Sequence, residues 1–387
     1  MLEKSLKAIP LIAASLFTST ALFGFAHAPL LSQVSQPMQQ TDSLTDLENK
    51  VSQLEEKKAN NRLGVTQPSR PELRDEVSFI IEGYGLYWKA EQEGMEYAVK
   101  SPDPFASGVM HKGKLLTHDF DWNGGFRVGI GLHLPYDSWE LKALWTRYCN
   151  SSTVHHHTSN PDFSPTFFSL PNVAWFATHA KSHYSIEYNT VDATLQRDYF
   201  VSRSLTLRPI FGVRGAWIDQ HFSQHFHGGP GGIGLFGPAT GTQKVHVKND
   251  FWGAGIFGGI NLNFCFNRQW SIYGDLAGSL LWGHFDVKVK NRITGVNISG
   301  AHPSGNVKSE TSNLKANVQT GLGLQWQTTF SKSRYRLLFS AGYEILFWFS
   351  QNNAPRFVFP GTLNNGYYES NGSLTLQGGT FRGLFEF

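Results

Sequence analysis

The sequence predicts an all-β protein, a transmembrane antiparallel up-and-down β-barrel of about 10–12 strands. Charged residues make up only 16% of the 387 residues, well below the roughly 25% of soluble domains. Aromatic residues reach 14%, and there are 39 glycines. The mean hydropathy is nevertheless −0.28, as expected where polar and apolar residues alternate and cancel in any window average. Composition alone leaves a soluble all-β sandwich open.

Residues 1–28 have the three parts of a secretory signal peptide. Lys4 and Lys7 give a positive start, "AIPLIAASLFTSTALFGF" is an apolar stretch, and "AHA" at 26–28 has the small-x-small form of a cleavage site. Pro29 would follow the cut, which is unfavourable, so an uncleaved anchor stays open. We expect export through the inner membrane of a Gram-negative bacterium, with removal of this segment.

Residues 29–75 form a predicted periplasmic segment with a short helix and a linker, "GVTQPSRPE". Its apolar residues follow the 3-4-3 rhythm of a coiled coil. They are Leu44, Leu47, Val51 and Leu54. A short oligomerising helix, for example of a trimer, and a helix lying on its own domain both fit, because two heptads are marginal alone. We place the barrel at residues 76–387.

From residue 76 onward, apolar residues recur at every second position, the period of a β-strand. Phe126, Val128 and Ile130, for example, share one face, opposite Arg127 and Gly129. The pattern predicts ten strands. They are Phe79–Lys89, Gly125–Leu134, Trp139–Tyr148, His183–Phe200, Leu205–Ile218, Val247–Phe264, Trp270–Val289, Leu314–Thr328, Tyr335–Phe349 and Leu374–Phe387. An even number places both ends of the barrel on the periplasmic side.

Three features favour a membrane barrel over a soluble sandwich. The apolar runs span about 9–13 residues, the length needed for a tilted crossing of a bilayer core. The connections alternate between tight turns, such as "PYDS" and "NRQ", and long loops, which is the outer-membrane plan. Aromatic residues gather at the ends of the apolar faces, as a girdle requires. These are Trp139, Trp252, Trp270, Trp282, Trp326 and Tyr335.

Two segments depart from the simple pattern. In "HYSIEYNTVDATLQRDYF", Tyr184, Ile186 and Tyr188 share a face, but the apolar residues from Val191 onward have the opposite parity. We expect a one-residue β-bulge near Asn189 or Thr190 to restore the phase. Separately, "MEYAVKS" and "KLLTHDF" would add a hairpin and raise the barrel to twelve strands.

Several stretches resemble a known family. They are "GLYWKAEQEGMEYA", "DFDWNGGFRVGIGLHLPYDSWELKALWTRY" and "RDYFVSRSLTLRPIFGVRGAWI". The chain is similar to the Legionella-type major outer membrane proteins, which are related in style to the porins of Chlamydia-like bacteria. The resemblance covers most of residues 76–387. It implies an outer-membrane porin or surface protein and carries no catalytic motif.

The face opposite the lipid-facing residues supplies the candidates for function. If the frames are right, the following point inward: Arg127, His133, Glu140, Lys142, Arg208, Arg214, Asn261, Asn263, Asp275, Lys315, Gln319, Arg336 and Glu344. A wet pore lined by both signs would pass small hydrophilic solutes by diffusion, and an excess of Arg and Lys would favour anions weakly. The alternative is a structural or adhesive surface barrel, because a ten-stranded barrel is narrow and side chains can fill it.

Histidines number 15, and most are expected in the long connections. Grouped imidazoles suit transition metals, but no closed spacing indicates a metal site, and we expect no cofactor. A third class, an outer-membrane hydrolase, needs a group such as His183 with Asp192 at the outer rim, and no motif selects that pair. We therefore expect no enzyme. The formal charge of +3 is too balanced to suggest a nucleic-acid partner.

The chain closes on "TFRGLFEF", with Phe381, Phe385 and Phe387 in step. Terminal residues are usually polar and frayed. We interpret these rings as lipid-facing residues of the last strand and as the signal by which the barrel assembly machinery recognises outer-membrane proteins. The expected partners are therefore outer-membrane lipid and that machinery.

The two cysteines yield a first testable prediction. The topology puts Cys149 at the outer end of its strand and Cys265 beside a periplasmic turn. An apolar band about 25 Å tall separates those levels, whereas bridged Cα atoms lie within about 7 Å. We expect no intramolecular disulfide, unlike the cross-linked chlamydial porins. Mass spectrometry of the unreduced protein checks this, and a Cys149–Cys265 peptide pair would contradict the topology.

Overall fold

The computed structural model describes part of the chain. The described residues are 50–51, 77–101, 113–134, 139–159, 162–167, 176–228, 241–294, 305–331, 334–358 and 366–387. The chain divides into two units, Met1–Lys57 and Lys58–Phe387. In the first unit only Lys50 and an exposed Val51 are described, both in helical geometry. The predicted signal peptide, the remaining heptad positions and the linker lie outside the described residues.

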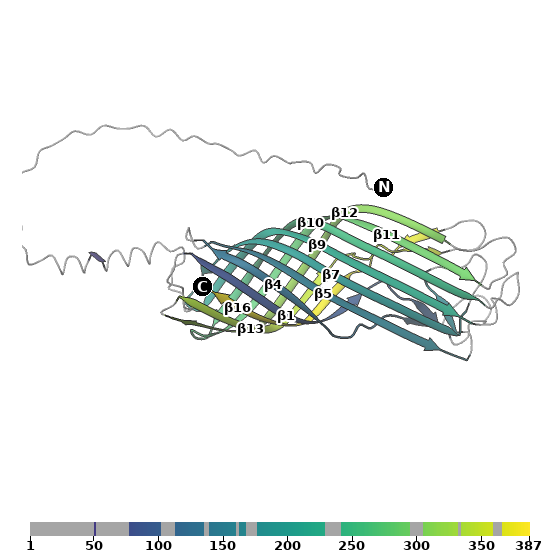
Figure 1. The fold of residues 1–387 in the computed structure, drawn as a ribbon, viewed down its shortest axis with the longest axis horizontal. Helices are drawn as coiled ribbons and strands as arrows, with labels where there is room; N and C mark the ends of the chain where they lie inside the picture. Colours follow the sequence, from purple (N-terminus) through teal and green to yellow (C-terminus); the bar gives the residue numbers. More distant parts are fainter. Residues whose placement is uncertain are drawn as a thin grey trace, which may run out of the picture. The chain divides into compact units, whose positions relative to one another are not determined.

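The second unit is a closed antiparallel barrel of ten strands (Figure 1). The strands are β1 (Ser78–Gln92), β4 (Asn123–His133), β5 (Trp139–His157), β7 (His179–Arg197), β9 (Leu205–His227), β10 (Thr242–Cys265), β11 (Trp270–Thr294), β12 (Gly305–Phe330), β13 (Tyr335–Trp348) and β16 (Leu374–Glu386). Each pairs with the next along the chain, and β16 pairs back with β1. A two-residue strand, β8 (Tyr199–Phe200), pairs only with β9. The predicted β-barrel is confirmed.

The predicted hairpin exists but does not belong to the barrel wall. Strands β2 (Ala98–Lys100) and β3 (Lys114–Leu116) pair with each other, and β2 also pairs with β6 (Phe163–Pro165). A further small sheet joins β14 (Pro355–Val358) to β15 (Gly366–Glu369). Both sheets come from the long connections, so the barrel has ten strands, and twelve is wrong.

The wall is much taller on one side than on the other. Strands β9, β10, β11 and β12 have 23, 24, 25 and 26 residues, whereas β1, β4, β13 and β16 have 15, 11, 14 and 13. In Figure 1 the tall strands run on past the ends of β13 and β16. Most described histidines lie within the strands, toward the ends near the long connections, as His155 does on β5 and His246 on β10. Their expected place in the connections is therefore wrong: pairing continues beyond the apolar band.

Aromatic rows mark the two edges of the apolar band. Trp217 and Trp252 face each other across β9 and β10, and both are exposed on the outer face. Phe264, twelve positions along β10, and Trp270 at the start of β11 lie near the turns and are also exposed. At about 3.3 Å per residue and a tilt of about 40°, twelve residues rise roughly 30 Å. That height matches the core of a bilayer.

The β-bulge expected in β7 is absent. The registers of β7 with β5 and with β9 run without interruption through Asn189 and Thr190. Tyr184 and Tyr188 are buried in the interior, and so is Asp192 on the same parity. The strand keeps its phase, and what changes is the chemistry of its inward face, from aromatic to polar. The prediction failed because apolar residues were assumed to face lipid throughout.

No helix among the described residues is long and apolar enough to cross a membrane.

The last strand completes the ring. Backbone bonds join Phe79 N to Phe387 O (2.7 Å) and Phe387 N to Phe79 O (3.0 Å). Phe381, Phe385 and Phe387 are exposed on the outer face, and the Phe387 ring stacks on Phe79 and Phe385 at 6.1 and 5.6 Å between centroids. The predicted outward parity is confirmed. The role of the rings in assembly stays a prediction.

We expect deletion of Phe387 to lower the amount of assembled barrel. It removes two backbone bonds at the closing seam and two ring contacts, each worth about 0.5–1.5 kcal/mol. The measurement is the heat-modifiable, surface-exposed fraction in cells. Phe339→Ala on β13, equally outward and 51% exposed, is the matched control. Equal levels for the deletion and the control would contradict a special role for the last residue.

Candidate functional site in the barrel interior

The inward faces of the strands divide the barrel interior into two layers. Toward the short turns, most inward positions are polar or charged, as with Glu82, Lys142 and Arg382, and a small apolar cluster of Ile80, Leu338 and Leu384 lies among them. Toward the long connections, inward positions are aromatic or aliphatic, as with Trp88 and Phe226. The strand alternation places both sets inside, because side chains of one parity face one side of a sheet.

An ion-pair network fills the polar layer near the turns. Glu82 pairs with Arg382 at 2.5 Å and with Lys142 at 3.7 Å. Lys142 also reaches Glu140 at 2.7 Å, and Glu140 reaches Arg208 at 3.4 Å. These side chains are nearly inaccessible, with 1% exposure for Glu82 and 5% for Lys142. Buried charges need such partners, since an isolated one would cost far more than the pair.

Further contacts in the polar layer reach strands that are not neighbours in the barrel, whereas the Arg214–Asp192 pair itself joins the neighbouring strands β9 and β7. Arg127 on β4 meets Glu344 on β13 at 3.1 Å. Arg214 on β9 is held by Asp192 at 2.6 Å, and its Nη1 donates to Asn317 Oδ1 on β12 at 2.8 Å. A bidentate arginine–carboxylate contact fixes geometry as well as charge. These contacts brace the barrel across its interior.

Within the polar layer, reaching up to Tyr188 of the apolar layer, lies a cavity of about 140 Å³. Its lining includes Tyr84, Arg127, Arg214, Asp275 and Glu344. A water molecule occupies about 30 Å³ in the liquid, so the cavity has room for a few waters among charged groups. It is the part of the described interior best suited to hold a small polar solute.

The structure places all thirteen predicted inward residues on the inner face or at its rim. Eight border the cavity: Arg127, Lys142, Arg208, Arg214, Asn261, Asp275, Gln319 and Glu344. Glu140 and Arg336 are buried in ion pairs, and Asn263 donates to Asn261. Lys315 lies farther out, where its Nζ donates to the Ser350 carbonyl at 2.5 Å. His133 ends β4, opposite Glu140, and is half-buried. Their role in lining a pore stays a prediction.

The sequence reasoning missed the acidic partners of these groups. Glu82, Asp192, Asp198 and Glu386 all pair with interior cations. Parity would have found three of them. Glu386 alternates with the outward Phe385 and Phe387, Asp192 alternates with Val191, and Glu82 alternates with the outward Ile81. With these carboxylates included, the interior charge is balanced.

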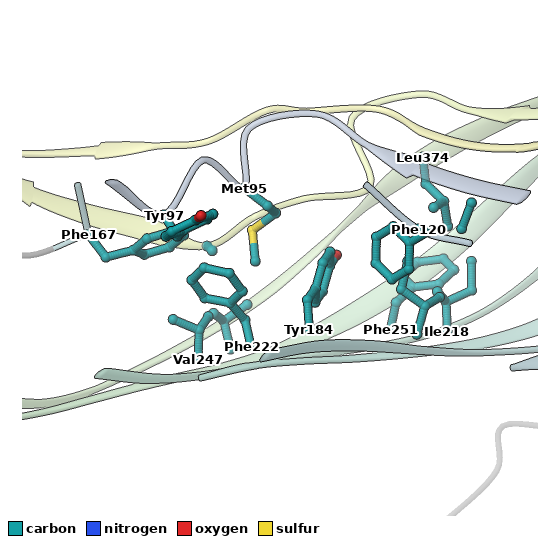
Figure 2. Packing of buried hydrophobic residues seen from close by; sticks show 14 of the residues in the cluster. Met95, Tyr97, Phe120, Phe167, Tyr184, Ile218, Phe222, Val247, Phe251 and Leu374 are labelled. Carbon is teal, nitrogen blue, oxygen red and sulfur yellow. The ribbon is translucent and has the colours of Figure 1, made fainter. Parts of the chain in front are cut away.

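The apolar layer is a continuous packed cluster that combines wall and connection residues. Met95, Tyr97 and Phe120 come from the β1–β4 connection, and Phe167 comes from the β5–β7 connection. Figure 2 shows Met95, Tyr97 and Phe167 facing Phe222, Tyr184 and Val247 of the wall. Tyr97 and Phe167 have no exposed surface. We call these inward-folded connection segments the plug.

One wall residue reaches across the lumen beneath the plug. Trp348, the last residue of β13, is fully buried. Its ring lies 6.0 Å from Tyr188 on β7 and 6.3 Å from Phe251 on β10, between centroids. Neither strand is a neighbour of β13 in the barrel. Ser350, two residues on, has a φ of 49°, so the chain turns sharply directly after the tryptophan.

His118 is a titratable group inside the plug. Its Nε2 lies 2.8 Å from Ser182 Oγ, and its ring contacts Tyr97, Tyr184 and Phe222 at 5.3–5.8 Å between centroids. Burial, and to a smaller extent the nearby His183, lowers the pKa of His118 to about 4. The imidazole is therefore neutral when the plug is packed.

The pair considered for hydrolysis does not assemble. Asp192 is buried inside the barrel against Arg214, whereas His183 faces the outside of β7 and bonds Thr153 Oγ1 at 2.7 Å. Residues an odd number apart on one strand lie on opposite faces. Within the described part of the chain, no group of three or more His, Cys, Asp and Glu is placed to hold a metal ion.

Comparison with solved structures finds membrane barrels of low similarity. The outer membrane protease OmpT of Escherichia coli is 11% identical, with 80% of this chain and 96% of that chain covered and a TM-score of 0.36. A Pseudomonas aeruginosa FadL homologue is 10% identical, with 80% and 90% covered and a TM-score of 0.25. The Pseudomonas putida toluene transporter TodX is 7% identical, with 81% and 89% covered and a TM-score of 0.21. A search of curated proteins found no match.

A family described as "Legionella pneumophila major outer membrane protein precursor" matches residues 71–387. The match covers all ten strands of the barrel, and it confirms the resemblance seen in the sequence. The chain therefore belongs to the Legionella major outer membrane protein family.

Proposed function

We propose that this outer-membrane barrel is a porin-like channel for small hydrophilic solutes, and that the packed interior is its closed form. The carrying observation is the position of Trp348. This side chain spans the lumen to Tyr188 and Phe251, and it stands directly at the start of the β13–β16 connection. A displacement of that connection would withdraw the ring from the lumen.

The polar layer supports a role in solute transport, and not only a role in filling the lumen. Charged groups in a buried layer are costly compared with apolar packing of similar volume, and apolar packing is what the outer layer of the same barrel uses. A chamber lined by Arg127, Arg214, Asp275 and Glu344 offers donors and acceptors to a hydrated solute. The balanced signs remove the basis for anion preference, so the proposal includes no charge selectivity.

The plug supports a mechanism of opening. Its segments are anchored by the three-stranded sheet of β2, β3 and β6, each strand only three residues long. Short strands of this kind contribute few hydrogen bonds, and such elements open at a lower free energy than the strands of a core. The ten-stranded wall can therefore stay intact while the plug moves.

The second candidate is a permanently closed barrel with a structural or adhesive role at the surface. The mutual pairing of the interior charges favours it, because Arg127, Arg214 and Arg382 each satisfy a carboxylate of the barrel itself. In that case the polar layer would serve to stiffen the wall. The proposal and this alternative differ in whether loosening the seal yields current.

Trp348→Ala tests the seal. We expect the refolded wild-type barrel to open rarely in planar bilayers, and the variant to show stepwise conductance with a clearly higher open probability, because the ring that spans the lumen is gone. Trp282→Ala is the matched control, since Trp282 is 63% exposed on the outer face. Heat-modifiable migration verifies folding of both variants. Silence of a folded Trp348→Ala barrel would reject the channel in favour of the closed barrel.

Acidification should open the plug through His118. The packed imidazole has a pKa of about 4, whereas a released histidine titrates near 6.5. The released form therefore binds more protons between these values, so closure weakens as pH falls from about 6.5 to about 4, by up to about 3 kcal/mol. Open probability recorded from pH 7.5 to 4.5 should rise, and His118→Gln should flatten the response. An unchanged response in His118→Gln would assign the effect to other groups.

A further inference from the structure

The outer face of the tall wall carries charged residues in lateral rows. An acidic row crosses five strands in direct register: Glu187, Asp219, Asp250, Asp286 and Glu310. Three basic rows follow toward the long connections. The first contains His221, Lys248, Lys288 and Lys308; the second His183, His246 and Lys290; and the third Lys181, His225, Lys244 and Arg292. Residues that face each other in adjacent strands stand side by side on the wall.

The three lysines of the first basic row pair with three of the five carboxylates in the acidic row, Asp250, Asp286 and Glu310. Lys248 pairs with Asp250 at 2.5 Å, and Lys288 pairs with Asp286 at 2.7 Å. Lys308 contacts both Glu310 and Asp286. Except for Lys308 with Asp286, which joins β12 to β11, the partners are two residues apart on one strand and so share the outer face. This pairing occupies the lysines of the first row, so the cations of the second and third rows carry the positive charge of the upper wall, while Glu187 and Asp219 take no part in these pairs.

The second and third rows hold four such cations, Lys181, Lys244, Lys290 and Arg292. All four are exposed, and none forms an ion pair with any residue that the structure describes. The histidines of these rows add further N–H donors. The field of this surface is therefore positive, and positive fields attract phosphate and other anions.

A groove of about 370 Å³ lies between the first and second basic rows on β7, β9, β10 and β11, and the third row follows just beyond it. Its polar lining is His183, His221, Ser223, His246, Lys248, Lys288 and Lys290. Imidazole and ammonium groups of this kind bind phosphate oxygens through charge-assisted hydrogen bonds. The groove holds many water volumes of about 30 Å³ each, which is ample for a phosphate group on a sugar.

The groove stands beyond the acidic row, on the side of the lipid band that faces the long connections. The acidic row begins two residues beyond Trp217 and Trp252, which mark the outer edge of that band. His246 lies six residues beyond Trp252, which corresponds to roughly 15 Å along the barrel axis. Lysine side chains on its rim can reach down toward the membrane surface while keeping their stems on the wall. The surface therefore faces the headgroup region of the outer leaflet.

We propose that this groove and the second and third basic rows bind the headgroup phosphates of the phosphorylated glycolipid of the outer leaflet. The charge of the wall is complementary to those phosphates, and the position next to the aromatic row puts them within reach. The proposal does not depend on whether the barrel conducts. A bound shell of lipid on β7–β11 would hold the tall wall upright in the membrane.

The test uses the full-length barrel, refolded in detergent and titrated with bisphosphorylated lipid A under native mass spectrometry. Replacing Lys244, Lys290 and Arg292 together by Gln should weaken binding by about 100-fold, because each basic residue near an anionic lipid surface contributes roughly 1 kcal/mol. The matched control replaces Arg203, Arg268 and Arg334 by Gln. These are equally exposed arginines in the turns at the opposite rim, and binding should stay within about twofold of wild type.

Three further arms separate phosphate recognition from other causes. Lys244→Arg, Lys290→Arg and Arg292→Lys together keep the charge and should keep the affinity, which excludes a folding defect as the cause of loss. Dephosphorylated lipid A should bind no better than the weakened variant. Equal binding of the dephosphorylated lipid would overturn the proposal, as would full affinity in the Gln variant. Displacement of lipid A by inorganic phosphate at equal concentration would also overturn it, because the site would then be one for free anions.

Discussion

The closing contact between β1 and β16 is the constraint on which the rest of the structure depends. Lipid offers no hydrogen-bond partner to a free strand edge, so the sheet must close on itself. Closure at ten strands sets the width of the lumen, and a barrel of this size leaves a space that side chains can fill. The two layers of the interior follow from that width. Side chains from opposite sides of the barrel contact each other, as Trp348 contacts Tyr188. Apolar side chains therefore pack against apolar ones, and charged side chains pair with opposite charges.

The two layers solve the filling problem in different ways. Near the turns the wall fills the lumen with charges, and each carboxylate and cation finds a partner on another strand, as Arg127 does with Glu344. Near the long connections, the inward side chains of the wall do not fill the lumen by themselves. Connection segments that fold inward, with residues such as Tyr97 and Phe167, complete an apolar core there. The cavity lies within the polar layer and is bordered on one side by Tyr188 of the apolar layer. A solute that passes through the barrel has to cross both layers. The plug, which is formed by connection segments and not by barrel strands, belongs to the apolar layer.

The extensions of the long strands β9–β12 have an inner and an outer face with different surroundings. The inner face of the β9–β12 extensions packs against the plug, as Phe222 and Val247 do in Figure 2. The outer face of the same extensions is free of that packing and carries the charged rows. Alternation along a strand makes this division possible, because neighbouring residues such as Val247 and Lys248 face opposite environments. Histidines that seemed to belong to loops are thus part of a structured surface.

The sequence by itself determined the barrel, the parity of most strands, the short turns and the outward rings of Phe385 and Phe387, because alternation and turn residues are local properties. It also placed Arg127, Arg214 and Glu344 inside. The tertiary structure decided which groups meet. Arg127 and Glu344 are far apart in the chain and come together only through the closure of the ring. The wrong prediction of a bulge in β7 has a similar cause. Alternation along the strand separates its two faces, but the inner face is apolar at Tyr184 and Tyr188 because the plug packs against the wall there.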